Sequence, residues 1–206
     1  MNNKSEDKFA AFKKILSDNF TAIVSFISIF IGIFTGACVY SFSDSFFKNE
    51  IMVAFLSFNT NFNDKTNIEI FSGMLISGLI YFFVMFVLGS NIFGKELSPV
   101  VTLFKTTGLG AIIAYLYQQF GAEGFEYALL VFIPGKMLFI FAALLITKLC
   151  FETSISLRSG LSKEDIAVLI KIYSIKSLFC LAVMIASWSV DFICLKAFSG
   201  LINFTL

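Results

Sequence analysis

Two long stretches without a charged side chain most constrain what this chain can fold into. They run from 19 to 43 and from 70 to 94, and each is 25 residues long. About 20 consecutive apolar residues in a helix cross the roughly 30 Å hydrocarbon layer of a bilayer. Both stretches therefore predict membrane-spanning helices, because lipid offers no hydrogen-bond partners for free backbone groups. The first stretch has no evident cleavage site, so we expect it to be retained.

The overall composition supports this interpretation. Hydrophobic residues make up 58% of the 206, with 28 Phe and only two Pro, and the mean hydropathy is +0.88. A soluble globule of this length could not cover so much apolar surface. The 15 basic residues are scattered among 14 acidic ones without a basic patch, which argues against a nucleic-acid partner. We expect an all-α, polytopic protein in which residues 1–206 form one integral membrane domain in contact with membrane lipid.

Three more apolar segments raise the expected number of spans to five. The third expected span contains Lys105 and the fourth contains Lys136. The fifth is the weakest by hydropathy and reaches full length only if Asp191 or Lys196 lies at a membrane interface. The five expected spans are 19–43, 70–94, 99–120, 127–147 and 173–196.

The basic residues predict the orientation of these spans. Five spans place the two termini on opposite sides, and basic residues in short loops stay on the cytoplasmic side. One side receives 11 Lys and Arg residues, Lys105 among them, and the other receives Lys48, Lys65 and Lys196. We therefore expect the N-terminus inside and the C-terminus outside. If a span had been missed or wrongly added, the basic residues would be divided more evenly between the two sides.

Two segments between the spans have patterns of their own. Residues 42–69, on the expected outer side, are rich in Asn, Asp and Ser but have an apolar centre at 51–58. They predict a loop that rests on the membrane surface or contacts a partner. Residues 161–176, on the inner side, begin with Ser162 three residues before Asp165, a capping pattern that predicts a helix leading into the fifth span.

The residue types argue against an enzyme. The chain has no His, the commonest general base and metal ligand near neutral pH. A Ser/His pair and an HExxH metal site are therefore impossible, and an aspartyl pair in the membrane would need a second buried Asp beside Asp191. The four Cys show no CxxC spacing and lie in or beside apolar blocks, where Cys packs as a small hydrophobe. We expect no catalytic residue, no cofactor and no bound metal.

Lys136 is a candidate site residue because a charge inside a span costs about 3 kcal/mol near the bilayer centre. It follows Pro134, which frees a backbone carbonyl and can break the helix. Three uses of Lys136 stay open at this point. It could line a substrate or ion site, contact a partner's carboxylate, or reach the outer interface with its long side chain.

Lys105 and Asp191 are expected nearer to the membrane surfaces. Residues 97–104, after the turn at Gly94, could form a short interfacial or re-entrant helix that holds Lys105 near the cytoplasmic headgroups. Asp191 and Lys196 are five residues apart near the outer end of the fifth span, and we expect both at the interface.

Small residues recur at the spacing of closely packed helices in the first three spans. Gly, Ala and Ser let the backbones of two helices approach each other in lipid. The pattern predicts close packing within the bundle, with self-association of two copies as the alternative. The pairs are Gly32 and Gly36, Gly73 and Ser77, and Gly110 and Ala114.

The segment from 89 to 134 carries a pattern of glycines and polar residues that is typical of one family. Between Lys105 and Pro134 the pattern matches, without gaps, the central motif of the stage II sporulation protein M family, which the chain resembles over roughly two thirds of its length. At Lys136 that family usually has an uncharged polar residue, so this lysine takes no role from the resemblance. The pattern consists of Gly89, Ser90, Gly94, Pro99, Lys105, Gly110, Gln119, Gly121, Glu123, Gly124 and Pro134.

The resemblance implies a non-catalytic, multi-pass scaffold of the bacterial cell membrane. Such a protein would recruit a peptidoglycan amidase and a lytic transglycosylase, which thin the septal wall during sporulation and drive engulfment. The implied contacts are the outer loop 42–69, the turn 121–126 and the spans. The residues also leave a second class open, a small transport or flippase-like component in which Lys136, Pro134 and the segment after Gly94 line a path.

Overall fold

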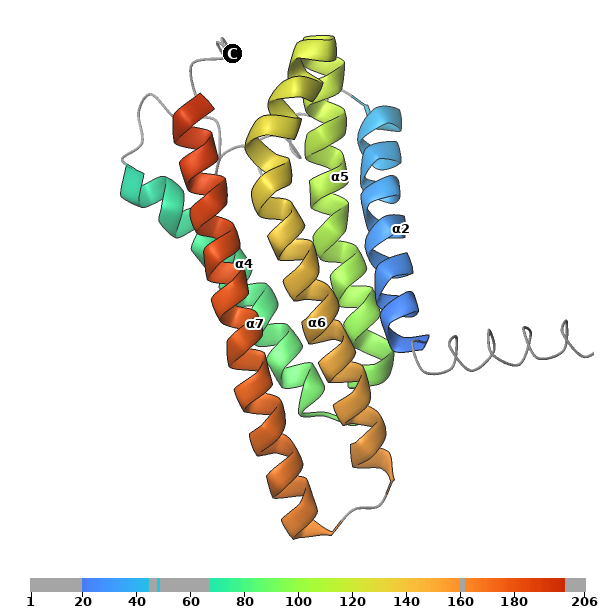
Figure 1. The fold of residues 1–206 in the computed structure, drawn as a ribbon. Helices are drawn as coiled ribbons and strands as arrows, with labels where there is room; N and C mark the ends of the chain where they lie inside the picture. The colour runs from blue at the N-terminus through green and yellow to red at the C-terminus, as the bar shows by residue number, and fades with distance from the viewer. Residues whose placement is uncertain (1–19, 45–47, 49–66, 160–161, 199–206) are drawn as a thin grey trace, which may run out of the picture.

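The fold is a bundle of long helices that pack side by side (Figure 1). It is described from a computed structural model, which defines residues 20–44, 48, 67–159 and 162–198. Over these residues every regular element is a helix, so the all-α prediction is confirmed there. The elements are α2 (Phe20–Phe42), α4 (Asn67–Gly89), α5 (Gly94–Tyr127), the short π-helix η1 (Ala128–Phe132), α6 (Ile133–Arg158) and α7 (Lys163–Phe198). The apolar centre expected at 51–58 lies outside the described residues.

Four stretches of the described chain are long and apolar enough to cross a membrane. The third is 65 residues long and contains α5, η1 and α6. In Figure 1, α5 rises along the bundle and α6 returns beside it. These features support a multi-pass membrane protein, whereas the number of crossings and the orientation stay predictions. The four stretches are Phe20–Phe42, Phe71–Gly89, Gly94–Arg158 and Lys163–Phe198.

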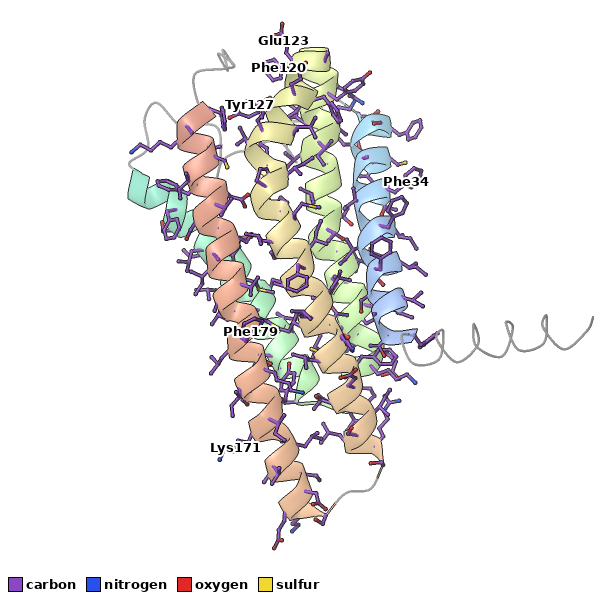
Figure 2. All side chains as sticks on the ribbon, in the orientation of Figure 1. Phe34, Phe120, Glu123, Tyr127, Lys171 and Phe179 are labelled. Atoms are coloured by element: carbon purple, nitrogen blue, oxygen red, sulfur yellow. The ribbon has the colours of Figure 1, made fainter. Side chains whose placement is uncertain are left out.

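Large apolar side chains cover the outside of the bundle. Phe30 and Phe34 of α2 are 66% and 65% exposed, and Phe179 of α7 is 62% exposed. Figure 2 shows Phe34 pointing away from the other helices. Hydroxyl side chains such as Thr102 and Ser154 are fully buried instead. This arrangement suits lipid, where the surroundings are apolar and polar groups find their partners between helices.

Glycines bring α2 and α5 into backbone contact. A Cβ atom on Gly36 would stand 1.9 Å from the carbonyl oxygen of Thr107, and one on Gly110 would stand 1.9 Å from the carbonyl oxygen of Ile33. Gly32 approaches α5 as closely. The GxxxG pair of the first span therefore packs within the chain. This agrees with close packing inside the bundle, the first of the two alternatives for these small residues.

Gly121 forms the turn from α5 towards the returning helix. Its backbone has φ 61° and ψ −134°, a conformation that is open almost only to Gly. A Cβ atom on Gly124 would stand 2.0 Å from the carbonyl oxygen of Leu116, so the chain folds back closely on α5. Glu123 is exposed at the tip of this turn, as Figure 2 shows.

A π-helical turn precedes Pro134, and the helix is not broken there. A proline has no N–H group, and its ring crowds the carbonyl group four residues earlier. The wider turn of η1 lies directly before this point, and Pro134 occupies the first turn of α6. The chain stays helical through the proline. The broken helix expected at Pro134 is therefore wrong.

The lower end of the bundle is tied together by α6. The Arg158 side chain donates hydrogen bonds to the carbonyl oxygen of Ile92 and, at 2.7 Å, to the carboxylate of Glu96. A Cβ atom on Gly94 would stand 2.3 Å from the carbonyl oxygen of Leu88, so Gly94 allows the tight turn between α4 and α5. Residues 97–104 are a continuous part of α5. The separate interfacial or re-entrant helix that the sequence left open for these residues is therefore not formed.

The first turn of α7 has the predicted cap. The backbone N–H of Asp165 donates to the Ser162 hydroxyl oxygen at 3.2 Å, and that hydroxyl donates to the Asp165 carboxylate at 2.7 Å. The helix predicted from residues 161–176 is confirmed, and it joins the apolar part of α7 without interruption.

The glycine contact between α2 and α5 predicts a measurable loss of stability. We expect Gly36→Ala to lower the free energy of unfolding by about 1–3 kcal/mol, because the added methyl group meets the backbone of α5. Thermal unfolding in detergent micelles measures the change. Val39→Ala, on the exposed face of the same helix, is the control and should change stability by less than about 0.5 kcal/mol. Equal melting temperatures for the two variants would contradict the backbone contact.

Candidate functional site

A buried ion pair joins α6 to α7. The ammonium group of Lys136 donates to Oδ2 of Asp191 at 2.5 Å. The Asp191 side chain is only 3% exposed and that of Lys136 is 26% exposed. Pairing offsets part of the cost of taking both charges out of water, whereas either charge alone in this place would be strongly destabilising.

Gly135 allows the carboxylate to reach α6. A Cβ atom on Gly135 would stand 2.0 Å from Oδ1 of Asp191, so no larger residue fits. Ser187, one turn earlier on α7, donates its hydroxyl to the carbonyl oxygen of Gly135 at 2.7 Å. Within the described part of the chain, Oδ1 of Asp191 is buried and has no hydrogen-bond partner. The carboxylate is thus held through its other oxygen, by Lys136.

Asp191 faces the interior of the bundle, where Lys136 of α6, 55 residues away in the sequence, binds it. Its expected position at the outer interface stays a prediction. Of the three uses considered for Lys136, pairing with a carboxylate agrees with the geometry, and the carboxylate belongs to the same chain. Lys196, five residues further along α7, is exposed.

Lys105 is held by α4 and lies far from both helix ends. Its ammonium group donates to the Ser77 hydroxyl oxygen at 2.7 Å and to the Ser77 carbonyl oxygen at 3.3 Å. At 1.5 Å per residue, Lys105 is about 16 Å along the axis from Gly94, where α5 begins. The position considered for it near the cytoplasmic headgroups stays a prediction, whereas the helix itself starts five residues before the expected span.

A cavity of about 140 Å³ brings the two lysines together. It is large enough for several water molecules or a small polar group. Two ammonium groups line it, and the one carboxylate nearby, Asp191, is paired with Lys136, so one positive charge is left unbalanced. All four helices from α4 to α7 contribute side chains to the wall, among them Ser77, Lys105, Lys136 and Trp188.

A chain of hydroxyl groups crosses the bundle next to this cavity, and sequence reasoning missed it. The hydroxyl groups of Tyr81 and Thr102 are 3.0 Å apart, and those of Thr102 and Thr147 are 2.8 Å apart. Thr147 also donates to the carbonyl oxygen of Ala143 at 2.7 Å. Each of the three helices has several hydroxyl residues, and the sequence does not reveal which of them face one another.

Cys150 has a specific hydrogen-bond partner in addition to its packing contacts. Its thiol donates to the carbonyl oxygen of Met85 at 3.0 Å and lies 3.3 Å from the Tyr173 hydroxyl. Tyr173 donates to the same carbonyl oxygen at 2.9 Å. All four Cys lie in described helices as free thiols, and Cys150 and Cys180 are buried. Their use as packing residues was expected, but the hydrogen bonds of Cys150 were not.

The remaining candidate residues do not gather with the lysines. They are distributed over three places in the fold: the contact between α2 and α5, the lower turn before α5, and the upper turn that leads into α6. Among the described residues, no group of three or more metal-ligating side chains comes together. The candidate residues concerned are Gly32, Gly36 and Gly110, then Gly94, and finally Gly121, Glu123, Gly124 and Pro134.

Comparisons with known proteins do not supply a function. No protein-family model, curated protein or solved structure matches the chain. The argument for a function therefore depends on the sequence pattern and on the geometry of the bundle.

The buried ion pair predicts a non-additive pattern of stabilities. We expect Lys136→Met and Asp191→Asn each to lower the free energy of unfolding by about 3–5 kcal/mol, because each leaves one buried charge alone. The double variant should lose clearly less than the sum of the two, as a double-mutant cycle of thermal unfolding in detergent would measure. As the control, Lys148→Met removes an exposed pair with Glu152 and should cost at most about 1 kcal/mol. Additive losses would rule out a direct interaction.

Proposed function

We propose that this chain is a non-catalytic scaffold of the bacterial cell membrane that recruits peptidoglycan hydrolases during sporulation. The proposal follows the resemblance to the stage II sporulation protein M family. The observation that carries it is that residues of the family pattern form helix contacts and turns. Gly110 seats α2 on α5, Gly121 and Gly124 form the upper turn, and Pro134 lies in the first turn of α6. A pattern devoted to packing suits a protein whose partners perform the chemistry.

The charged side chains inside the bundle are consistent with this role. Lys136 and Asp191 join α6 to α7, and Lys105 joins α5 to α4. A transporter would need these charged groups to move, whereas here they hold helices together. A rigid bundle of this kind can present its loops and its outer faces to membrane-bound partners.

We further propose that the bundle crosses the membrane five times, with the N-terminus inside. The five crossings would be α2, α4, α5, η1 with α6, and α7. Because Lys105 lies within the bundle, the excess of basic residues on the inner side becomes ten against three. Lys95, Arg158 and Lys163 lie towards the lower end in Figure 1, and the acidic turn with Glu123 and Glu126 lies at the opposite end.

The proposed topology predicts which ends of the bundle can be labelled from outside. Glu123→Cys and Ser159→Cys would be placed singly in a chain whose four native Cys are changed to Ser, since both positions are exposed. A membrane-impermeant maleimide added to intact cells should modify Glu123→Cys. It should modify Ser159→Cys only after the membrane is permeabilised. Labelling of both sites in intact cells would mean that the proposed topology has one crossing too many. Labelling of Ser159→Cys but not of Glu123→Cys would mean that the orientation is inverted.

Two outer segments are the proposed contacts for the hydrolases, whose substrate lies outside the membrane. The turn 121–126 is exposed on both sides of Gly124. The loop 42–69 is the other segment, and its apolar centre offers a partner more surface than the turn does. Most of this loop lies outside the described residues, so the proposal for it depends on the sequence pattern alone.

Purification from the native host tests the scaffold function. The tagged protein, isolated in mild detergent during septation, should retain a peptidoglycan amidase or a lytic transglycosylase, as quantitative mass spectrometry would show. Replacing 42–69 with a neutral linker should lower that recovery by about tenfold, which corresponds to a loss of about 1.4 kcal/mol of binding free energy. Lys148→Met, at an exposed inner position, should leave recovery unchanged. Absence of any hydrolase from the native protein would count against the scaffold.

One observation favours the second candidate, a small transport component, because two lysines line a cavity inside the membrane. The double variant Lys136→Met with Asp191→Asn removes both charges of the ion pair while avoiding an unpaired charge. In vesicles, a transporter with this variant should lose flux of its solute, whereas a scaffold should keep its hydrolases. Loss of flux with hydrolases absent would establish the transport function instead.

A further inference from the structure

The unbalanced positive charge in the cavity belongs to Lys105. Lys136 is neutralised by Asp191 at 2.5 Å. Among the described residues, the hydrogen-bond partners of Lys105 are the two oxygens of Ser77, both of which are uncharged. Charged groups within membrane spans are usually paired with an opposite charge, because an unpaired one is costly in a medium of low dielectric constant. The site therefore lacks an anion.

The depth of Lys105 limits which anions can reach it. Its ammonium group is bound to Ser77, which is the eleventh of the 23 residues of α4 and so lies midway along that helix. The phosphates of lipid headgroups lie roughly 15 Å from the centre of the bilayer, at its surfaces. The anions found at mid-depth in membranes are the carboxylates of other membrane helices.

The cavity is partly open, and most of its wall comes from α4 and α5. Figure 1 shows α4 leaning away from α5 towards its upper end. Lys105 and Leu109, one turn apart on α5, both line the cavity and are both partly exposed. The lysine is therefore not sealed inside the bundle.

A second copy of the chain is a poor source of the missing anion. Asp191 is the one carboxylate well inside the described helices, and it is already paired within its own chain. The other described carboxylates lie towards helix ends or in turns, as Glu96 and Glu123 do. A symmetric dimer could not place one of them at the depth of Lys105.

We propose that Lys105 binds the carboxylate of an Asp or Glu in a transmembrane helix of a partner protein, which packs against the bundle beside the open cavity. This proposal builds on the scaffold function and specifies the chemistry by which a partner is recognised within the membrane. The cavity of about 140 Å³ has room for one carboxylate beside Lys105 and the Ser77 hydroxyl. The partner helix would supply the one negative charge that balances the site.

Site-specific photo-crosslinking in the native host tests the proposal. A photoreactive phenylalanine analogue would replace Leu109 at the rim of the cavity, and the same analogue at Phe34, on the exposed face of α2, would be the control. Mass spectrometry would identify the crosslinked peptide. We expect the Leu109 adduct, but not the Phe34 adduct, to contain a membrane helix with an Asp or Glu near its centre.

Charge variants then test the contact itself. Lys105→Met should lower the yield of the adduct by about tenfold, and Lys105→Arg should restore most of it, since it keeps the charge. Changing the acidic residue of the partner to Asn or Gln should lower the yield by the same factor while the chain itself is unaltered. This partner-side variant keeps the test valid if Lys105→Met fails to fold. Unchanged yields, a helix without an acidic residue, or an adduct with phospholipid alone would overturn the proposal.

Failure of this inference can be told apart from failure of the scaffold function. If hydrolases copurify with the native protein and with Lys105→Met equally, and no acidic helix is crosslinked, the scaffold stands without the intramembrane contact. If an acidic helix is crosslinked but belongs to a protein with no role in the cell wall, the contact stands and the scaffold function fails.

Discussion

In lipid, helices are not driven together by the exclusion of water, so they must be held by close contact and by polar groups. The α2–α5 pair satisfies this constraint by close contact, since Gly36 and Gly110 place each backbone against the other, and by a hydrogen bond from Gln118 to Ser41. The α6–α7 pair combines both means, because Gly135 removes a side chain so that Asp191 can bind Lys136. The small residues and the charged residues thus act together in holding the helices.

The two membrane lysines show how the same residue type takes different roles in one bundle. Lys136 has a full counter-charge and joins two helices, and its carboxylate partner is almost completely buried. Among the described residues, the hydrogen-bond partners of Lys105 are the oxygens of one serine, and its charge lies beside a partly open cavity. In the first arrangement the two charges balance within the chain. The second is complete only with an anion from elsewhere, which suits a protein that works through partners.

Local patterns predicted the parts of this fold that depend on neighbouring residues in the sequence. The apolar runs predicted helices, Ser162 with Asp165 predicted the start of α7, and the small-residue spacing predicted the close packing of α2. Hydropathy reports how apolar a segment is, but not which side chain faces it from another helix. Asp191 was therefore placed at the interface, since nothing near it in the sequence indicated Lys136.

The continuity of α5 before Lys105 was not predictable for a related reason. The turn at Gly94 and the proline that follows favoured a separate short helix, whereas packing of Arg158 and Glu96 extends α5 down to that turn. Similarly, the hydroxyl chain through Tyr81 and Thr102 depends on the rotation of each helix about its axis. Single-sequence periodicity is too weak to fix that rotation when helices are apolar on all sides.

The π-helical turn before Pro134 has a consequence for the phase of the helix. One extra residue in a helical turn shifts every later side chain by about 100° around the axis. Tyr127 and Gly135 are eight residues apart, and with the extra residue they share a face as residues seven apart do in an α-helix. Both are buried, and η1 packs against α7. The inserted residue thus sets the direction from which Lys136 meets Asp191. The ion pair therefore depends on the number of residues between the upper turn and Lys136.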